Sequence, residues 1–89
     1  EALRMGLINQ LVPADKLESF VDDYCQMIAA NAPLTVRSVK AIVREAMKDE
    51  RERDLALCKR MVDDCFASED YAEGRTAFME KRKPVWKGR

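Results

Sequence analysis

Carboxylate side chains could carry acid–base chemistry, but their spacing in this chain is unfavourable. Three adjacent pairs stand out: Asp22 and Asp23, Asp63 and Asp64, and Glu69 and Asp70. Adjacent residues on a helix point about 100° apart, whereas general acid–base catalysis needs two carboxyls that converge on one bond from separated positions. We therefore expect each pair to lie on a solvated helix face.

Hydroxyl nucleophiles have no base to activate them, because the sequence contains no histidine. The usual serine–histidine arrangement is therefore absent around Ser19, Thr35 and Ser38. No glycine-rich phosphate loop is present either. The sequence gives no sign of a self-contained active site.

The three cysteines, Cys25, Cys58 and Cys65, form no CxxC pair. A structural zinc site needs about four ligands, so the sequence does not favour a metal. Cys58 and Cys65 are seven residues apart and share one helix face, where we expect small core or interface residues. Unpaired thiols favour a reducing interior.

Basic residues gather at the C-terminal end. Six lie between Gly74 and Arg89 against one acid, Glu80, so this segment carries +5 in a chain whose net charge is zero. Two interpretations remain open. The cations either end a solvated helix, where they suit the negative end of the helix dipole, or they attract phosphate groups.

The last helix is bracketed at both ends. Ser68 is a capping residue, followed by two acids that suit the positive end of the dipole, and the helix should run through the cations 81–83 until Pro84 stops it. One face carries Tyr71, Gly74, Phe78 and Lys81. A glycine inside a helix costs roughly 0.5–1 kcal/mol relative to alanine. We expect close packing against a neighbouring helix to offset this cost, with approach of a ligand as the alternative.

Three further helices are predicted upstream. The first starts at Pro13 and Asp15, with Glu18 completing a capping box, and stops near Ala30. The second starts at Pro33 and the third ends before Ser68, and residues 48–53 form a loop or solvated turn between them. The apolar positions of these two helices are Val36, Val39, Val43, Ala46 and Met47, and then Leu55, Cys58, Met61, Val62, Cys65 and Phe66.

The predicted fold is all-α, a small bundle of about four helices preceded by a helix end and a short extended segment. Residues 1–5 are interpreted as the last turn of a helix that Gly6 ends, and residues 7–12 as the extended segment. Hydrophobic residues make up 47% and charged residues 36% of the chain, and no apolar run approaches the ~20 residues that cross a bilayer. The core should be thin, so we expect self-association. The start at Glu1, without a leader, is interpreted as the start of a fragment.

Three stretches resemble one protein family. The run SED..EG..AF.EKR.P..KGR is similar to the C-terminal signature of the crotonases, the enoyl-CoA hydratases and isomerases. EALRMGLINQLVP resembles the family's segment between catalytic core and C-terminal helices, and NAPLTVRSVK resembles the start of its next helix. Family members are about three times longer, with their oxyanion donors and catalytic glutamates upstream, and none of those residues matches a position here.

The resemblance implies a division of the chain and a function. Residues 1–12 would link a missing catalytic core to a helical domain, residues 13–89, which serves subunit association in a trimer or dimer of trimers. Phe78 and Lys81 would wall the acyl-CoA pocket, with no cofactor beyond the coenzyme A of the substrate. The chain alone should be inactive, and its parent is taken as a hydratase or double-bond isomerase by family frequency.

The resemblance also implies a cytoplasmic enzyme, or one of the mitochondrial matrix if the source is eukaryotic. A membrane partner is not expected. The alternative is an independent helical interaction module that binds RNA through its basic C-terminus, although nucleic acid is the less favoured partner.

Overall fold

The computed structural model describes all residues of the chain, 1–89, and contains helices and connecting segments but no strand. Four α-helices follow one another: α1 (Leu17–Ala29), α2 (Pro33–Ala46), α3 (Leu55–Ala67) and α4 (Glu69–Glu80). Two short 3-10 helices, η1 (Ala14–Lys16) and η2 (Glu50–Glu52), precede α1 and link α2 to α3. The predicted all-α fold with four helices is confirmed.

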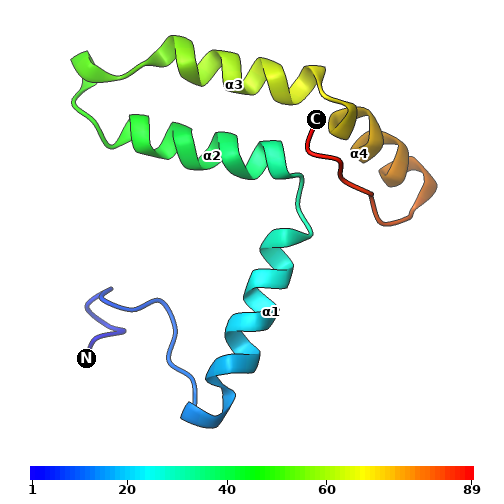
Figure 1. The fold of residues 1–89 in the computed structure, drawn as a ribbon. Helices are drawn as coiled ribbons and strands as arrows, with labels where there is room; N and C mark the ends of the chain where they lie inside the picture. Colours follow the sequence, from blue (N-terminus) through cyan, green and yellow to red (C-terminus); the bar gives the residue numbers. More distant parts are fainter.

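The helices form an open arrangement (Figure 1). Helices α2 and α3 pair as a hairpin, α4 continues from α3 after a sharp bend, and α1 projects away from the other three. The radius of gyration is 17.2 Å, whereas a compact chain of this length would have roughly 12 Å. The accessible surface is 7940 Å², against roughly 5,300 Å² for a compact protein of 10.2 kDa. Much of the surface therefore lacks a partner within the chain.

The first residues form a hydrogen-bonded turn of the kind expected where a helix ends. The Met5 N–H donates to the Glu1 carbonyl at 2.9 Å, and the Leu7 N–H donates to the Ala2 carbonyl at 2.9 Å. Gly6 has φ +74°, the left-handed conformation that glycine adopts without steric cost. Residues 8–12 have no regular secondary structure.

Helix α1 does not begin as predicted. The capping box of Asp15 and Glu18 is wrong, because the chain enters the helix through η1 and Lys16 is the N-cap, with no side-chain cap hydrogen bond. Asp15 already lies inside the 3-10 turn and cannot act as the residue that precedes the helix. The end is as expected: Ala30 is the C-cap, and the Asn31 side chain donates to the Met27 carbonyl at 2.8 Å.

The face that α2 turns toward α3 differs from the predicted one. Ser38 and Glu45, seven residues apart, are buried on the packed face. The expected apolar positions are exposed, including Val39 and Met47. On α3 the prediction is partly right: Cys58, Met61 and Cys65 are half-buried, but Leu55, Val62 and Phe66 are exposed. Periodicity finds apolar faces but does not say which of two faces meets a neighbour inside the same chain.

Glu45 explains how a polar face can pack. Its carboxylate accepts from the Lys48 ammonium at 2.7 Å and from the Asp54 backbone N–H at 2.9 Å, so it holds the turn between α2 and α3. The hydrogen bond from Lys48 is the main reason that the pKa of Glu45 is lowered. Asp54 in turn caps α3 by accepting from the Leu57 N–H at 2.7 Å. The thin core is confirmed, since Ala77 is the one fully buried hydrophobic residue.

Helix α4 starts as predicted and ends earlier. The Ser68 hydroxyl accepts from the Tyr71 N–H at 3.0 Å. The helix stops at Glu80, and Lys81 has φ +55° and ψ +39°. The Arg82 N–H donates to the Ala77 carbonyl at 3.0 Å and the Lys81 N–H to the Phe78 carbonyl at 3.3 Å, the pair of bonds of a Schellman motif. The expectation that residues 81–83 form the last turn is therefore wrong.

Candidate functional site

A C-terminal strap, residues 84–89, runs back along α4 (Figure 1). Asp70, only 2% exposed, holds it: one carboxylate oxygen accepts from the Lys87 N–H at 2.7 Å and the other from the Gly88 N–H at 2.9 Å. The Asp70 N–H donates to the Arg89 carbonyl at 3.0 Å. The expectation of a solvated carboxylate is wrong for Asp70, because its partners are backbone N–H groups that no sequence pattern reveals.

Glu73 makes a second clamp one turn later. Its two carboxylate oxygens accept from the Arg82 guanidinium at 2.6 and 3.0 Å, and one of them also accepts from the Val85 N–H at 2.8 Å. The hydrogen bonds from Arg82, followed by that from Val85, lower the pKa of Glu73 to about 2. Glu73 therefore stays ionised through the whole ordinary pH range and fixes the chain where it turns back after α4.

Glu69 makes a looser third contact. Its carboxylate pairs with the Lys87 ammonium at 3.2 Å and the Arg89 guanidinium at 3.4 Å, both well exposed. The Lys87 hydrogen bond and the positive charge of Arg89 lower the pKa of Glu69. Such exposed pairs contribute little stability individually.

These contacts change the interpretation of the basic segment. Arg82 pairs with Glu73 and Glu80, and the last two cations pair with Glu69. The cations of the segment without an ion pair are Arg75, Lys81 and Lys83. Half of the basic residues therefore hold the strap, which weakens the interpretation as a phosphate-attracting tail.

Gly74 provides room for Trp86 of the strap. A Cβ built on Gly74 would lie 3.2 Å from Cη2 and 3.4 Å from Cζ3 of the indole, tighter than ordinary van der Waals contact. The expected close packing at Gly74 is thus present, but its partner is the strap and not a neighbouring helix. The indole Nε1–H also donates to the Ala30 carbonyl, 56 residues earlier, at 2.8 Å.

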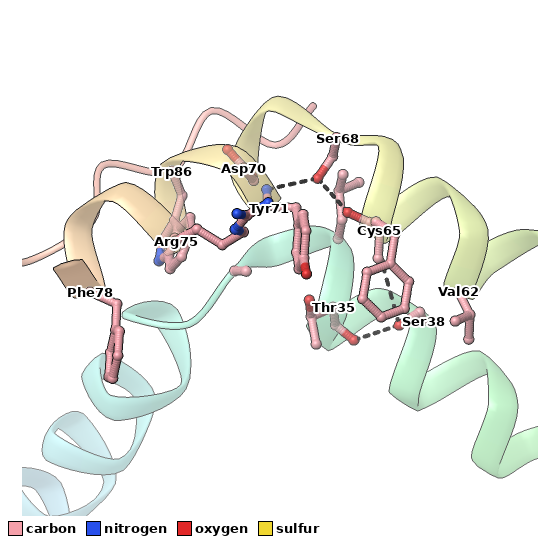
Figure 2. Close-up of a pocket in the computed structure, with 14 residues that line it drawn as sticks. Thr35, Ser38, Val62, Cys65, Ser68, Asp70, Tyr71, Arg75, Phe78 and Trp86 are labelled. Atoms are coloured by element: carbon pink, nitrogen blue, oxygen red, sulfur yellow. Dashed lines mark hydrogen bonds between the residues drawn. The ribbon is translucent and has the colours of Figure 1, made fainter.

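An apolar groove of about 490 Å³ opens between the start of α2, the second half of α3, and α4 (Figure 2). Phe78 stands at one end of the groove and Val62 at the other, with Tyr71 between them (Figure 2). The Phe66 and Tyr71 rings meet edge to face with their centroids 5.0 Å apart, and the Arg75 guanidinium lies 5.9 Å from the centre of the Tyr71 ring. Because the Asp70 carboxylate accepts backbone N–H groups of the strap, Arg75 is the one charged group of the lining whose side chain makes no hydrogen bond.

The structure places only one of the two predicted site residues in the groove lining. Phe78 lines the groove and is 81% exposed, so its ring is available to a ligand or to another protein surface. Lys81 lies outside the groove lining, at the left-handed residue that follows α4. The prediction that the two share one helix face is wrong for Lys81, because the helix has already ended.

Sequence reasoning missed the role of Trp86, Asp70 and Glu73. One signal could have pointed to Trp86: a helical glycine whose cost must be offset, followed twelve residues later by the only tryptophan of the chain.

No group of three or more Cys, Asp or Glu side chains is arranged to hold a metal ion. None of the helices combines the length and the apolar character that crossing a bilayer requires.

Four helices, closed by a strap that acids of the last helix clamp, define an all-helical unit with apolar faces left uncovered. The family model for enoyl-CoA hydratase/isomerase matches residues 1–89. The chain therefore belongs to the enoyl-CoA hydratase/isomerase family, as the three sequence stretches predicted.

Named relatives and solved structures agree. The short-chain-enoyl-CoA hydratase of Clostridium acetobutylicum is 35% identical over 93% of this chain, and the carnitinyl-CoA dehydratase of Proteus mirabilis is 39% identical over 100% of it. The crystal structure of an enoyl-CoA hydratase from Mycobacterium tuberculosis superimposes with a TM-score of 0.86 at 31% identity over 99% of this chain. An enoyl-CoA hydratase from Bacillus anthracis gives a TM-score of 0.85 at 32% identity, also over 99% of the chain.

The chain spans about a third of the length of these proteins. It covers 32% of the Clostridium hydratase, 36% of the Proteus dehydratase, and 35% and 34% of the two solved chains.

Proposed function

We propose that this chain is the C-terminal helical part of an enoyl-CoA hydratase/isomerase-type enzyme that acts on acyl-CoA thioesters. The observation that carries the proposal is the family match over the whole chain combined with coverage of only a third of each relative. In this proposal residues 1–12 connect a catalytic core to the helical domain, residues 13–89. The three free cysteines favour a reducing compartment, which we take to be the cytoplasm.

The first role that we propose is association. The accessible surface exceeds that of a compact protein of this size by roughly 2,600 Å², within the range that obligate interfaces bury. The excess includes the exposed apolar side chains of α1 and α2. We propose that the parent's core and other subunits cover these faces, and that the isolated chain self-associates through them.

The second role is to wall the acyl-CoA site through Phe78 and Lys81. Phe78 offers an exposed ring at one end of an apolar groove. Lys81 is the only non-glycine residue with positive φ. A left-handed conformation costs a residue with a Cβ roughly 1–2 kcal/mol, and glycine is the usual residue at this position of a Schellman motif. A lysine kept there at that cost supports a use for its ammonium, such as binding a CoA phosphate.

Ligand titrations of the full-length parent test this role. Lys81→Ala should weaken binding of free CoA by about 1–2 kcal/mol, and the loss should shrink as salt rises. Phe78→Ala should weaken long acyl chains by about 1–3 kcal/mol and leave free CoA nearly unchanged, because only the chain would touch the ring.

Two neighbours serve as matched controls. Lys83→Ala removes an exposed cation without an ion pair, and Met79→Ala removes an exposed apolar side chain adjacent to Phe78. Neither should change the titrations. Equal losses for all ligands, or none, would remove Phe78 and Lys81 from the proposed site.

The isolated chain should be inactive. The resemblance puts the oxyanion donors and catalytic glutamates in the part of the family that this chain does not cover. Preorganised donors of that kind are often the largest catalytic contribution. Purified chain should not hydrate crotonyl-CoA, and turnover that persists after repurification would contradict the proposal.

A further inference from the structure

Only three residues, 30–32, connect α1 to α2, and α1 has no buried residue to hold it in place. Ala30 ends α1, and Ala32 precedes α2 with φ −56° and ψ +118°, so the backbone changes direction sharply here. A short connection of this kind would let α1 swing unless something else fixes it.

The strap contacts the chain on both sides of this three-residue connection, which we call the hinge. The Trp86 indole donates to the Ala30 carbonyl at the end of α1. Gly88, two residues on, passes Pro33 at the start of α2: a Cβ on Gly88 would lie 3.8 Å from Pro33 Cγ. Gly88 has φ +75°, a conformation that side-chain-bearing residues rarely adopt, so the strap bends where it meets Pro33.

The strap is itself fixed to α4 at these same residues. Lys87 and Gly88 donate their N–H groups to the buried Asp70 carboxylate, and the indole rests on Gly74. One side of the strap therefore bonds α4 while the other side contacts the hinge. The 2.8 Å hydrogen bond of Trp86 joins elements that lie 56 residues apart in sequence.

We propose that the strap is a brace and that Trp86 is a positioning residue, which sets the direction of α1 relative to the unit of α2, α3 and α4. The brace fixes how the apolar face of α1 is presented beside the groove that ends at Phe78. This inference concerns the geometry of the chain alone and does not depend on the proposed enzymatic function.

Distances between two spin labels test the brace directly. One label is placed on Cys25, exposed on α1, and the other on Arg60→Cys, exposed on α3, with Cys58 and Cys65 replaced by alanine. Labelled protein is diluted into an excess of unlabelled protein so that distances between copies do not contribute. This reference variant should give a single narrow distance distribution.

Two substitutions should broaden the distribution. Trp86→Ala removes the indole. Gly74→Leu fills its seat with a residue that favours helix more strongly than glycine, so α4 should keep its helical circular dichroism while the strap is displaced. Val85→Ala is the matched control, because Val85 is exposed and contributes to the strap through its backbone N–H.

The outcomes are distinct. Loss of the narrow peak in Trp86→Ala and Gly74→Leu, but not in Val85→Ala, supports the brace. If Trp86→Ala unfolds, Gly74→Leu with intact helical signal still decides. A broad distribution in the reference variant, or a peak unchanged in Gly74→Leu, would overturn the proposal.

Discussion

Helices α1 and α4 are nearly equal in length, at thirteen and twelve residues, but they contact the rest of the molecule in opposite ways. The residues that start and line α4 have partners nearby. Its capping serine bonds the first turn of the helix, and three acids and a glycine contact the segment that follows the helix. α1 presents an apolar stripe to solvent: Leu17, Val21, Tyr24, Met27 and Ile28.

The difference shows which polar groups the chain satisfies by itself and which apolar surface it leaves exposed. Polar contacts around α4 join residues close in sequence, so they form whether or not the rest of a larger protein is present. The side chains of the α1 stripe remain 48–55% exposed, and burying apolar area contributes about 25 cal/mol per Å². α4 should therefore be ordered by its own contacts, whereas the exposed stripe of α1 should need a partner surface to bury it.

The largest expected effect comes from adding a charge to the α1 stripe. Tyr24→Glu should weaken self-association by about 2–4 kcal/mol, as removal of an interface tyrosine and burial of an unpaired carboxylate would. Sedimentation equilibrium over a wide concentration range measures this. Ser19→Glu, on the opposite side of α1, is the control and should leave the association unchanged. A reference chain that stays at 10.2 kDa at all concentrations would contradict self-association through the α1 stripe.

The next effect tests the self-sufficiency of α4. Asp70→Ala removes the acceptor of two backbone N–H groups and should lower the free energy of unfolding by about 2–3 kcal/mol, since hydrogen bonds to a charged group contribute about 1.5–3 kcal/mol. Urea unfolding at one fixed protein concentration measures it. Asp64→Ala, an exposed acid without a hydrogen bond, should change stability by less than about 0.5 kcal/mol. Equal effects would mean that the strap does not stabilise α4.

A pH titration examines the second clamp. The pKa of Glu73 is lowered to about 2, because Arg82 and the Val85 N–H bind its ionised form. A lowered pKa stabilises the fold above the unfolded pKa, near 4.5, and this contribution is lost as pH falls toward 2. The Val85 amide resonance of the folded chain reports the folded-state pKa of Glu73, so it should stay constant from neutral pH to about 3 and move as pH falls toward 2. Glu73→Gln should abolish that movement, and movement that begins near neutral pH would contradict the clamp.

The smallest effect is a gain in stability. Lys81→Gly relieves the left-handed strain of a residue with a Cβ but adds the entropy cost of glycine, for a net stabilisation of about 0.5–1 kcal/mol. Thermal unfolding should show a raised midpoint. Lys83→Gly lacks the strain and should be neutral or destabilising. A loss of stability in Lys81→Gly would show that the lysine side chain itself contributes to the fold.

The sequence predicted the helices well and their packing poorly. Pro33 and Ser68 mark helix starts through local chemistry, and both were found where expected. The valines of α2 form the apolar face that the spacing predicts, but Ser38 and Glu45 occupy the face packed against α3. Periodicity reports that a face will be buried, whereas the surface that buries it can belong to residues outside the sequence.

The candidate site was only half predictable. Phe78 was found in an apolar groove, which its spacing on α4 permitted. The clamps were missed because Asp70 and Glu73 bind backbone N–H groups. Almost every residue carries such a donor, so the sequence does not show which one a carboxylate binds. The helix end at Lys81 was missed because a left-handed lysine looks like any other cation near a helix C-terminus.

The clamps also determine which side chains of the strap are free to vary. The strap supplies main-chain N–H groups at 85, 87 and 88, so its conformation is encoded in the carboxylates of α4 more than in its own side chains. Most residues at 85 or 87 would present the same donor, and proline alone would remove it. We therefore expect side chains at Val85 and Lys87 to vary among related chains, whereas Asp70 and Glu73, whose carboxylates bind the strap, should be kept.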